Sequence, residues 1–237
     1  MKTTNFSFVA HESKGDVSAC LAKPRGAKAI LVLGHGAGAG MHHGNMERIA
    51  GELYDRKIGS LRYQFPFMER GGGRDSQPVS LSTVVNAIRQ AKKMSRNKPI
   101  LAGGHSFGGR MTSLAAAEST FPSFVKGLIF FGFPLHAPNK PSSDRAAHLH
   151  SILQPMLFLT GTRDALNSLD LFRPIVKKLG AGASKKPPRN GPVKLHLLDT
   201  ANHSYKTLKK TRASDEDVFV EMARVVDEWI SDSLSLN

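Results

Sequence analysis

The segment Gly104-His105-Ser106-Phe107-Gly108 points more directly than any other to how this chain folds. It fits the pattern G-x-S-x-G, in which a serine sits on a sharp turn between a strand and a helix. The flanking sequence supplies both elements, because residues 99–102 read as a short buried strand and residues 109–118 as a helix rich in Ala, Leu and Met. Glycine is expected at 104 and 108 because the strained turn crowds its neighbours and a Cβ there would clash.

Segments of strand and helix character alternate on both sides of this turn. After an opening hairpin at 6–9 and 17–21, the expected strands are residues 29–33, 60–65, 99–102, 126–133, 156–160 and 193–198. The expected helices are residues 45–57, 81–91, 109–118, 166–179 and 215–234. Repeated strand-then-helix order predicts an α/β fold with a mainly parallel sheet and helices on both faces, in a single domain spanning residues 1–237.

Three connecting segments carry expectations of their own. The polar, Pro-rich and His-rich segment 135–153 predicts a loop with one helical turn, which leaves little or no lid over the sheet. Residues 180–188 predict a surface linker. Ser214 is the expected N-cap of the last helix, with Asp215, Glu216 and Asp217 in its first turn.

The composition sets bounds on the class of protein. Hydrophobic residues make up 40% of the chain and charged residues 22%, which is typical of a soluble globular protein. The single cysteine, Cys20, excludes an intramolecular disulfide framework. The first residues lack the apolar core of a signal peptide, and the longest apolar stretch, 127–135, is too short to span a bilayer. A cytoplasmic protein without a membrane span is therefore expected.

The formal net charge of +14 is the unusual feature of the composition. Basic residues concentrate in two groups, namely Lys185, Lys186, Arg189 and Lys194, and then Lys206, Lys209, Lys210 and Arg212. A basic surface attracts nucleic acid, anionic lipid or an acidic substrate. The simpler interpretation is a solvated face, and no aromatic residue interrupts 185–189 to form a stacking platform for single strands.

Three residues with complementary chemistry follow expected strands, at the edge where ligands bind in open parallel sheets. They are Ser106, Asp164 and His203, after the strands at 99–102, 156–160 and 193–198. A serine hydroxyl becomes a good nucleophile when an adjacent base takes its proton, and neutral imidazole does this near pH 7. A carboxylate fixes the imidazole tautomer and stabilises the imidazolium that forms. The pattern predicts a Ser-His-Asp triad.

The glycine-rich segment 34–40, which follows the strand at 29–33, supplies a fourth part. Backbone N–H groups at such a position stabilise the negative charge that develops in an acyl-transfer transition state. The predicted donors of this oxyanion hole are the N–H groups of Ala37 and Phe107.

With these residues in place, the chain resembles the α/β-hydrolase superfamily, in its dienelactone-hydrolase-like branch. More narrowly, it is similar to the small bacterial proteins related to the testis-expressed and non-specific-lethal-complex hydrolase-like domains. The matching segments span most of the chain in order, and they are residues 34–41, 61–67, 103–110, 132–136 and 161–164.

The resemblance implies the α/β-hydrolase fold and a carboxylesterase-like serine hydrolase. Such an enzyme cleaves an ester or related acyl bond of a small substrate through an acyl-enzyme, with no cofactor and no metal. Dienelactone hydrolases use a cysteine nucleophile, whereas this chain has Ser106, which argues against dienelactone as its natural substrate.

Two positions have competing interpretations. Asp164 also fits an N-cap for the helix that follows it, and Asp199, four residues before His203, is a rival for the acid of the triad. The glycine-rich segment also fits a dinucleotide fingerprint, although the next strand carries no acid for a ribose hydroxyl and only Arg62 for a 2′-phosphate.

Other interpretations concern the protein as a whole. The histidines at 35, 42 and 43, or at 136, 148 and 150, do not show a zinc-binding spacing. The charge of +14 leaves open a non-catalytic scaffold that binds an anionic partner such as nucleic acid. The fold and triad also allow acyl transfer or lyase chemistry in place of hydrolysis.

Overall fold

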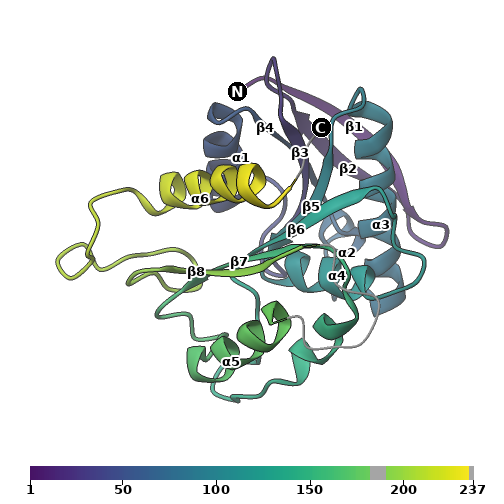
Figure 1. Cartoon of the computed structure of the whole chain (residues 1–237). Coiled ribbons are helices and arrows are strands. Elements are labelled where there is room, and N and C mark those ends of the chain that lie inside the picture. Colours follow the sequence, from purple (N-terminus) through teal and green to yellow (C-terminus); the bar gives the residue numbers. More distant parts are fainter. Residues whose placement is uncertain (182–190, 235–237) are drawn as a thin grey trace.

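Most strands of the sheet are short apolar runs, and β3, β4 and β7 are buried along their whole length. The computed structural model describes residues 1–181 and 191–234 and places the strands in the order β1-β2-β4-β3-β5-β6-β7-β8 (Figure 1). Their bounds are β1 (Thr3–His11), β2 (Gly15–Ala22), β3 (Ala29–Gly34), β4 (Ile58–Tyr63), β5 (Ile100–His105), β6 (Val125–Phe131), β7 (Met156–Gly161) and β8 (Val193–Leu198).

The pairing directions confirm the expected sheet. β1 and β2 form the predicted antiparallel hairpin, and β2 joins β4 in antiparallel orientation. All pairs from β4 to β8 are parallel. The carboxyl ends of these strands therefore meet at one edge of the sheet, where open α/β sheets bind their ligands.

Helices cover both faces of the sheet, as predicted. The helices α1 (Gly44–Asp55) and α6 (Val218–Ser233) lie on one face, and α3 (Gln77–Met94), α4 (Phe107–Ala116) and α5 (Leu169–Gly180) lie on the other (Figure 1). The chain also forms a short helix α2 (Pro66–Arg70) and a 3₁₀ helix η1 (Asp144–Ser151). Between β6 and β7 the described residues hold no larger element than η1, so no lid is evident there.

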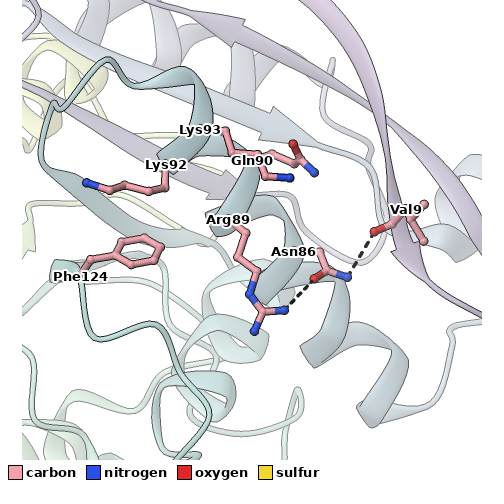
Figure 2. A pocket seen from close by; sticks show the side chains of 7 residues that line it. All are labelled: Val9, Asn86, Arg89, Gln90, Lys92, Lys93 and Phe124. Atoms are coloured by element: carbon pink, nitrogen blue, oxygen red, sulfur yellow. Dashed lines mark hydrogen bonds between the residues drawn. The ribbon is translucent and has the colours of Figure 1, made fainter.

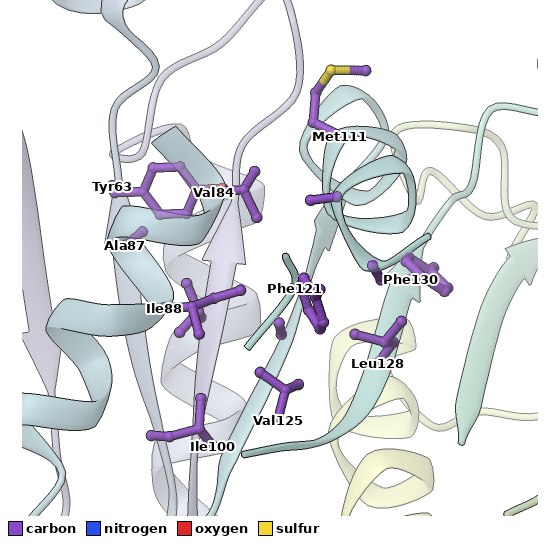
Figure 3. Close-up of a cluster of buried hydrophobic side chains, with 14 of the residues drawn as sticks. Tyr63, Val84, Ala87, Ile88, Ile100, Met111, Phe121, Val125, Leu128 and Phe130 are labelled. Carbon is purple, nitrogen blue, oxygen red and sulfur yellow. The ribbon is translucent and has the colours of Figure 1, made fainter. Parts of the chain in front are cut away.

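Alternation along the strands divides the core into two layers. Ile30 and Val32 of β3 face the core beneath α3 and α4, whereas Leu31 and Leu33 face the core beneath α1 and α6. Figure 3 shows the first of these cores, with Ile88 of α3 above the sheet residues Ile100 and Leu128. Because both faces of the sheet are covered there, β3 and β7 are nearly continuous apolar runs rather than alternately polar strands.

The predicted start of the last helix is wrong by three residues. α6 begins at Val218, and its N-cap is Asp217 rather than Ser214. The Asp217 carboxylate accepts a hydrogen bond from the Phe219 N–H at 2.9 Å and pairs with Arg48 at 2.8 Å. An aspartate cap that an ion pair also holds satisfies the first N–H groups of the helix, so the helix starts there.

Further differences between the expected and the observed elements concern α5, α2 and the segment 135–153. α5 begins at Leu169 rather than 166, after its N-cap Ser168. α2 was not predicted, and it begins at Pro66, whose fixed φ suits the first helical position. The segment 135–153 holds the eight-residue η1, more than the one turn expected. The linker predicted at 180–188 falls mostly in 182–190, outside the described residues.

Trp229 of α6 provides a test of the packing between α6 and the sheet. Its side chain is 1% exposed and lies so close to β6 that a Cβ on Gly127 would be 2.7 Å from Trp229 Cη2. We expect Trp229→Ala to lower the free energy of unfolding by about 3–5 kcal/mol, measured by urea denaturation. The matched change Leu171→Ala, at an exposed position on α5, should cost less than about 1 kcal/mol, and equal losses would contradict this packing.

Candidate active site

Ser106 occupies a strained turn between β5 and α4. Its backbone has φ 51° and ψ −113°, a conformation that non-glycine residues adopt only when the surroundings enforce it. The Ser106 N–H donates to the Phe131 carbonyl at 3.1 Å, and the Arg110 N–H donates to the Ser106 carbonyl at 2.9 Å. The turn is thus held by β6 on one side and by the first turn of α4 on the other.

The glycines of this turn are required by close backbone contact with the end of β3. A Cβ on Gly104, where φ is +159°, would lie 2.4 Å from the Gly34 carbonyl oxygen. A Cβ on Gly108 would lie 2.3 Å from the Gly34 carbonyl carbon. Real Cβ atoms do not approach this closely, so the expected reason for glycine at both positions is confirmed.

The structure brings Ser106, His203 and Asp164 into one hydrogen-bonded chain. His203 Nε2 lies 2.9 Å from Ser106 Oγ, and His203 Nδ1 lies 2.9 Å and 2.8 Å from the two Asp164 carboxylate oxygens. The Asp164 side chain is 1% exposed and that of His203 is 22% exposed. The acid is therefore shielded from water, whereas part of the imidazole is accessible.

Two loops that are far apart in sequence carry the acid and the histidine, and backbone contacts join them. The Arg163 N–H donates to the Ala201 carbonyl at 2.9 Å, and the Thr200 N–H donates to Thr162 Oγ1 at 2.8 Å. A Cβ on Gly161 would lie 2.3 Å from the Ala201 carbonyl oxygen. The loops after β7 and β8 are therefore fixed together, which sets the distance from Asp164 to His203.

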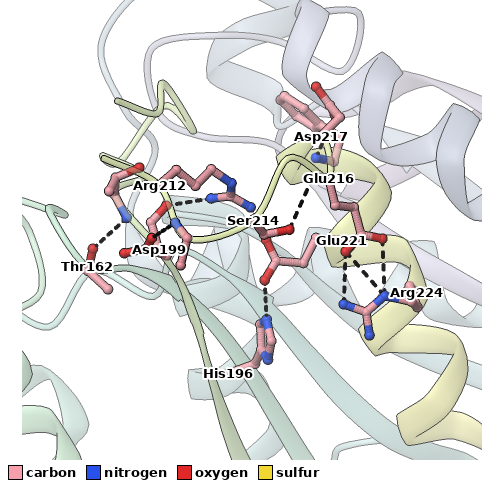
Figure 4. Close-up of polar contacts among 12 residues, drawn as sticks. Thr162, His196, Asp199, Arg212, Ser214, Glu216, Asp217, Glu221 and Arg224 are labelled. Carbon is pink, nitrogen blue, oxygen red and sulfur yellow. Dashed lines mark hydrogen bonds and ion pairs between the residues drawn. The ribbon is translucent and has the colours of Figure 1, made fainter. Parts of the chain in front are cut away.

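His203 contacts the carboxylate of Asp164, whereas Asp199 has other partners. Asp199 accepts a hydrogen bond from the Ala213 N–H at 2.8 Å, and its backbone carbonyl accepts from Arg212, in the polar network of Figure 4. No contact joins Asp199 to His203 within the described residues. Asp164 does accept from the Leu166 N–H at 2.8 Å, but that bond stabilises a turn before α5, whose N-cap is Ser168.

His35 orients the loop that follows β3. Its Nε2 accepts from the Phe65 N–H at 3.0 Å, and its Nδ1–H donates to the Gly36 carbonyl at 2.7 Å. The Gly36 carbonyl and the Ala37 N–H belong to one trans peptide and point in opposite directions. The Gly108 N–H also donates to the His35 carbonyl at 3.0 Å, which ties the loop to α4 close to the Phe107 N–H.

No role in the site is predicted from the sequence for three neighbouring residues, which are His105, Tyr205 and Gly132. His105 Nδ1 lies 2.7 Å from Tyr205 Oη, and the His105 and His203 ring centroids are 5.2 Å apart. Burial, and then the nearby His203, lower the pKa of His105 to about 4, so a neutral ring lies beside the imidazole. Gly132 has φ +65°, and a Cβ there would lie 3.6 Å from both Asp164 Oδ2 and His203 Nδ1. The apolar run of β6 (Val125–Phe131) is the sequence signal that could have indicated a strand end next to Gly132.

Four of the other histidines make local contacts. His136 Nε2 accepts from the Ser168 N–H at 3.0 Å, and His148 Nε2 lies 2.8 Å from Ser113 Oγ. His42 pairs with Glu47, and the His43 side chain accepts from the Asn45 N–H at the start of α1. In the described part of the chain, no three His, Cys, Asp or Glu side chains gather in a way that would hold a metal ion.

Among the basic residues singled out by sequence, those in the described part of the chain differ in exposure. Lys206, Lys209 and Lys210 are exposed, but Arg212 is 5% exposed and pairs with Glu221, as Figure 4 shows. Lys185, Lys186 and Arg189 lie outside the described residues. Among the helices in residues 1–181 and 191–234, none combines the length and apolarity needed to cross a membrane.

An open groove of about 440 Å³ lies away from the predicted site residues, none of which lines it. Figure 2 shows its lining side chains, which come mainly from α3: Val9, Asn86, Arg89, Gln90, Lys92, Lys93 and Phe124. Asn86 donates to the Val9 carbonyl at 3.2 Å and thereby joins α3 to β1.

Comparison with known proteins identifies the family. The model of a family described as an alpha/beta hydrolase domain matches residues 27–231. The chain therefore belongs to this family of α/β hydrolases.

Three solved structures share the fold over nearly their whole length. A dienelactone hydrolase from Anabaena variabilis has 16% identity and a TM-score of 0.70, with 99% of this chain and 100% of that one covered. An α/β serine hydrolase homologue from Coxiella burnetii has 17% identity and a TM-score of 0.70, with 96% and 97% covered. The esterase domain of a Rhodothermus marinus protein has 16% identity and a TM-score of 0.69, with 98% and 99% covered. At these identities the likeness establishes the α/β-hydrolase fold.

Substitution of Gly108 tests the backbone contact between the turn and β3. We expect Gly108→Ala to lower the free energy of unfolding by about 1–3 kcal/mol or more, because the new Cβ overlaps Gly34. Gly51→Ala in α1 is the matched control, since a Cβ there meets nothing within 4 Å. In urea denaturation this control should be neutral or stabilising by up to about 1 kcal/mol. An unchanged Gly108→Ala protein would argue against the contact.

His35 gives the fold a pH dependence. Burial lowers its pKa from 6.5 to about 4, so the folded state favours the neutral ring more than the unfolded state does. Stability from this residue is present above pH 6.5 and is lost as the pH falls toward 4. We expect the free energy of unfolding of His35→Gln to depend less on pH in this window, by up to about 1.4 kcal/mol per pH unit. Parallel curves for the two proteins would contradict the neutral assignment.

Proposed function

We propose that this protein is a serine hydrolase that cleaves an ester or related acyl bond of a small substrate. The hydrogen-bonded chain from Ser106 through His203 to Asp164 carries the proposal, since the nucleophile and the orienting acid each lie within 2.9 Å of the base His203. Membership of the α/β hydrolase family and likeness to a serine hydrolase homologue and an esterase domain support it.

Each residue has a defined role in the proposed mechanism. The Ser106 hydroxyl attacks the substrate carbonyl while His203 Nε2 takes its proton. The Asp164 carboxylate accepts from His203 Nδ1–H and stabilises the imidazolium. His203 then protonates the leaving group, and a water activated by the same imidazole releases the acyl group from Ser106.

The oxyanion hole in this mechanism consists of the Ala37 and Phe107 N–H groups. The Phe107 N–H begins α4, where the helix leaves its first N–H groups without intrahelical acceptors. The Ala37 N–H points away from the Gly36 carbonyl that His35 holds. Such fixed donors stabilise the oxyanion without reorganising during the reaction.

Hydrolysis of a panel of short and long acyl 4-nitrophenyl esters tests the proposal. We expect turnover by the wild type, and a loss of about 10⁴-fold or more in kcat for Ser106→Ala, because no other group replaces the nucleophile. Ser204→Ala is the control, since Ser204 is exposed and adjacent to His203. Its turnover should match the wild type. Equal turnover by Ser106→Ala, or none by the wild type on any ester, would refute the proposal.

A further inference from the structure

Three arginines gather around the first turn of α4, the helix that follows Ser106. Arg110 is one helical turn after Ser106 on α4, and helical side chains lean toward the N-terminal end of their helix. The Arg74 guanidinium carbon lies 5.8 Å from the centroid of the Phe107 ring. Arg145 of η1 donates to the His136 carbonyl at 2.9 Å, and the charges of Arg74 and Arg145 both act on Arg110.

Several arginines of the fold have a carboxylate counter-ion, but Arg74, Arg110 and Arg145 have none in the described part of the chain. Arg48, Arg70, Arg212 and Arg224 each pair with a carboxylate. Among residues 1–181 and 191–234, no carboxylate pairs with Arg74, Arg110 or Arg145. Asp75, the neighbour of Arg74 in sequence, is occupied by Arg70 and Lys14.

Arg110 is the least satisfied of the three. Its Nε is buried and has no hydrogen-bond partner in the described structure. Burial and the two neighbouring guanidinium groups lower the pKa of Arg110, so its charge is held in an unfavourable place. His148 adds no further positive charge beside Arg110, because burial and Arg110 lower its pKa to about 4 and leave the ring neutral.

No carboxylate among the described residues neutralises the positive charge of these arginines, so an anionic group of a bound substrate could do so. A guanidinium presents its N–H groups in a planar fork that matches a carboxylate or phosphoryl group. We propose that Arg110, with Arg74 and Arg145, binds an anionic group of the substrate, so that the preferred substrates are esters carrying a carboxylate or a phosphoryl group. This inference rests on the proposed hydrolase function and names its substrate class.

Three esters that share one leaving group test the inference. They are 4-nitrophenyl butyrate, which is neutral, 4-nitrophenyl hemiglutarate, which carries a carboxylate, and 4-nitrophenyl 4-phosphonobutyrate, which carries a phosphonate. We expect kcat/KM of the wild type to be about 10- to 100-fold higher for at least one anionic ester than for the neutral one. A higher kcat/KM for the hemiglutarate would indicate a site for a carboxylate, and a higher kcat/KM for the phosphonobutyrate would indicate a site for a phosphoryl group.

Arg110→Gln should abolish this preference, measured as the ratio of kcat/KM between the anionic and the neutral ester. Arg25→Gln removes the same charge from an exposed position before β3, at the opposite edge of the sheet, and should keep the preference. Arg74→Gln is a second variant at an exposed position, which keeps the test decisive if Arg110→Gln does not fold. A wild type without preference, or variants that retain it, would overturn the inference.

A binding measurement separates this inference from the proposed function. Calorimetric titration with glutarate and with inorganic phosphate should detect binding of one anion that Arg110→Gln or Arg74→Gln weakens about 10-fold, and no binding of neutral glutaramide. Such binding without turnover of any ester would retain the anion site and refute the hydrolase. Turnover of neutral and anionic esters alike, without anion binding, would refute the anion site and retain the hydrolase.

Discussion

The turn at Ser106 and the end of β3 touch through backbone atoms alone. Gly34 on β3 faces Gly104 and Gly108 on either side of the serine, and a Cβ at 104 or 108 would come within 2.4 Å of Gly34. This approach is close enough for the Gly108 N–H to bond the His35 carbonyl. The contact therefore fixes two things at once, the strained conformation of the serine and the position of the loop after β3.

The remaining parts of the site depend on the same edge of the sheet. Parallel pairing from β3 to β8 brings the loops after β3, β5, β7 and β8 together. Backbone hydrogen bonds between the last two loops then place His203 against Asp164. Each loop begins at a strand end whose position the sheet already fixes, so a short loop is enough to bring its side chain into the site.

Much of this arrangement follows from local sequence signals. The apolar runs gave the strands, and the serine pattern with its glycines gave the turn, because backbone crowding there admits glycine alone. Helix starts were less accessible, since Asp217 caps α6 with help from Arg48, which lies far away in sequence. Asp164 and Asp199 both follow a strand end, and they are distinguished by their partners, because His203 Nδ1 contacts the Asp164 carboxylate whereas Asp199 accepts from the Ala213 N–H. The roles of His105 and Arg110 depend on neighbours from other loops, which no local pattern reveals.

In the proposed mechanism, Asp164 acts through His203 to make Ser106 a nucleophile. Labelling by a fluorophosphonate, followed by mass spectrometry of the modified peptide, measures this reactivity at each serine. We expect a single adduct at Ser106 in the wild type and in Asp199→Asn, formed at similar rates, and labelling slowed by orders of magnitude in Asp164→Asn. An adduct elsewhere, no adduct at all, or equal rates in Asp164→Asn and the wild type would contradict it.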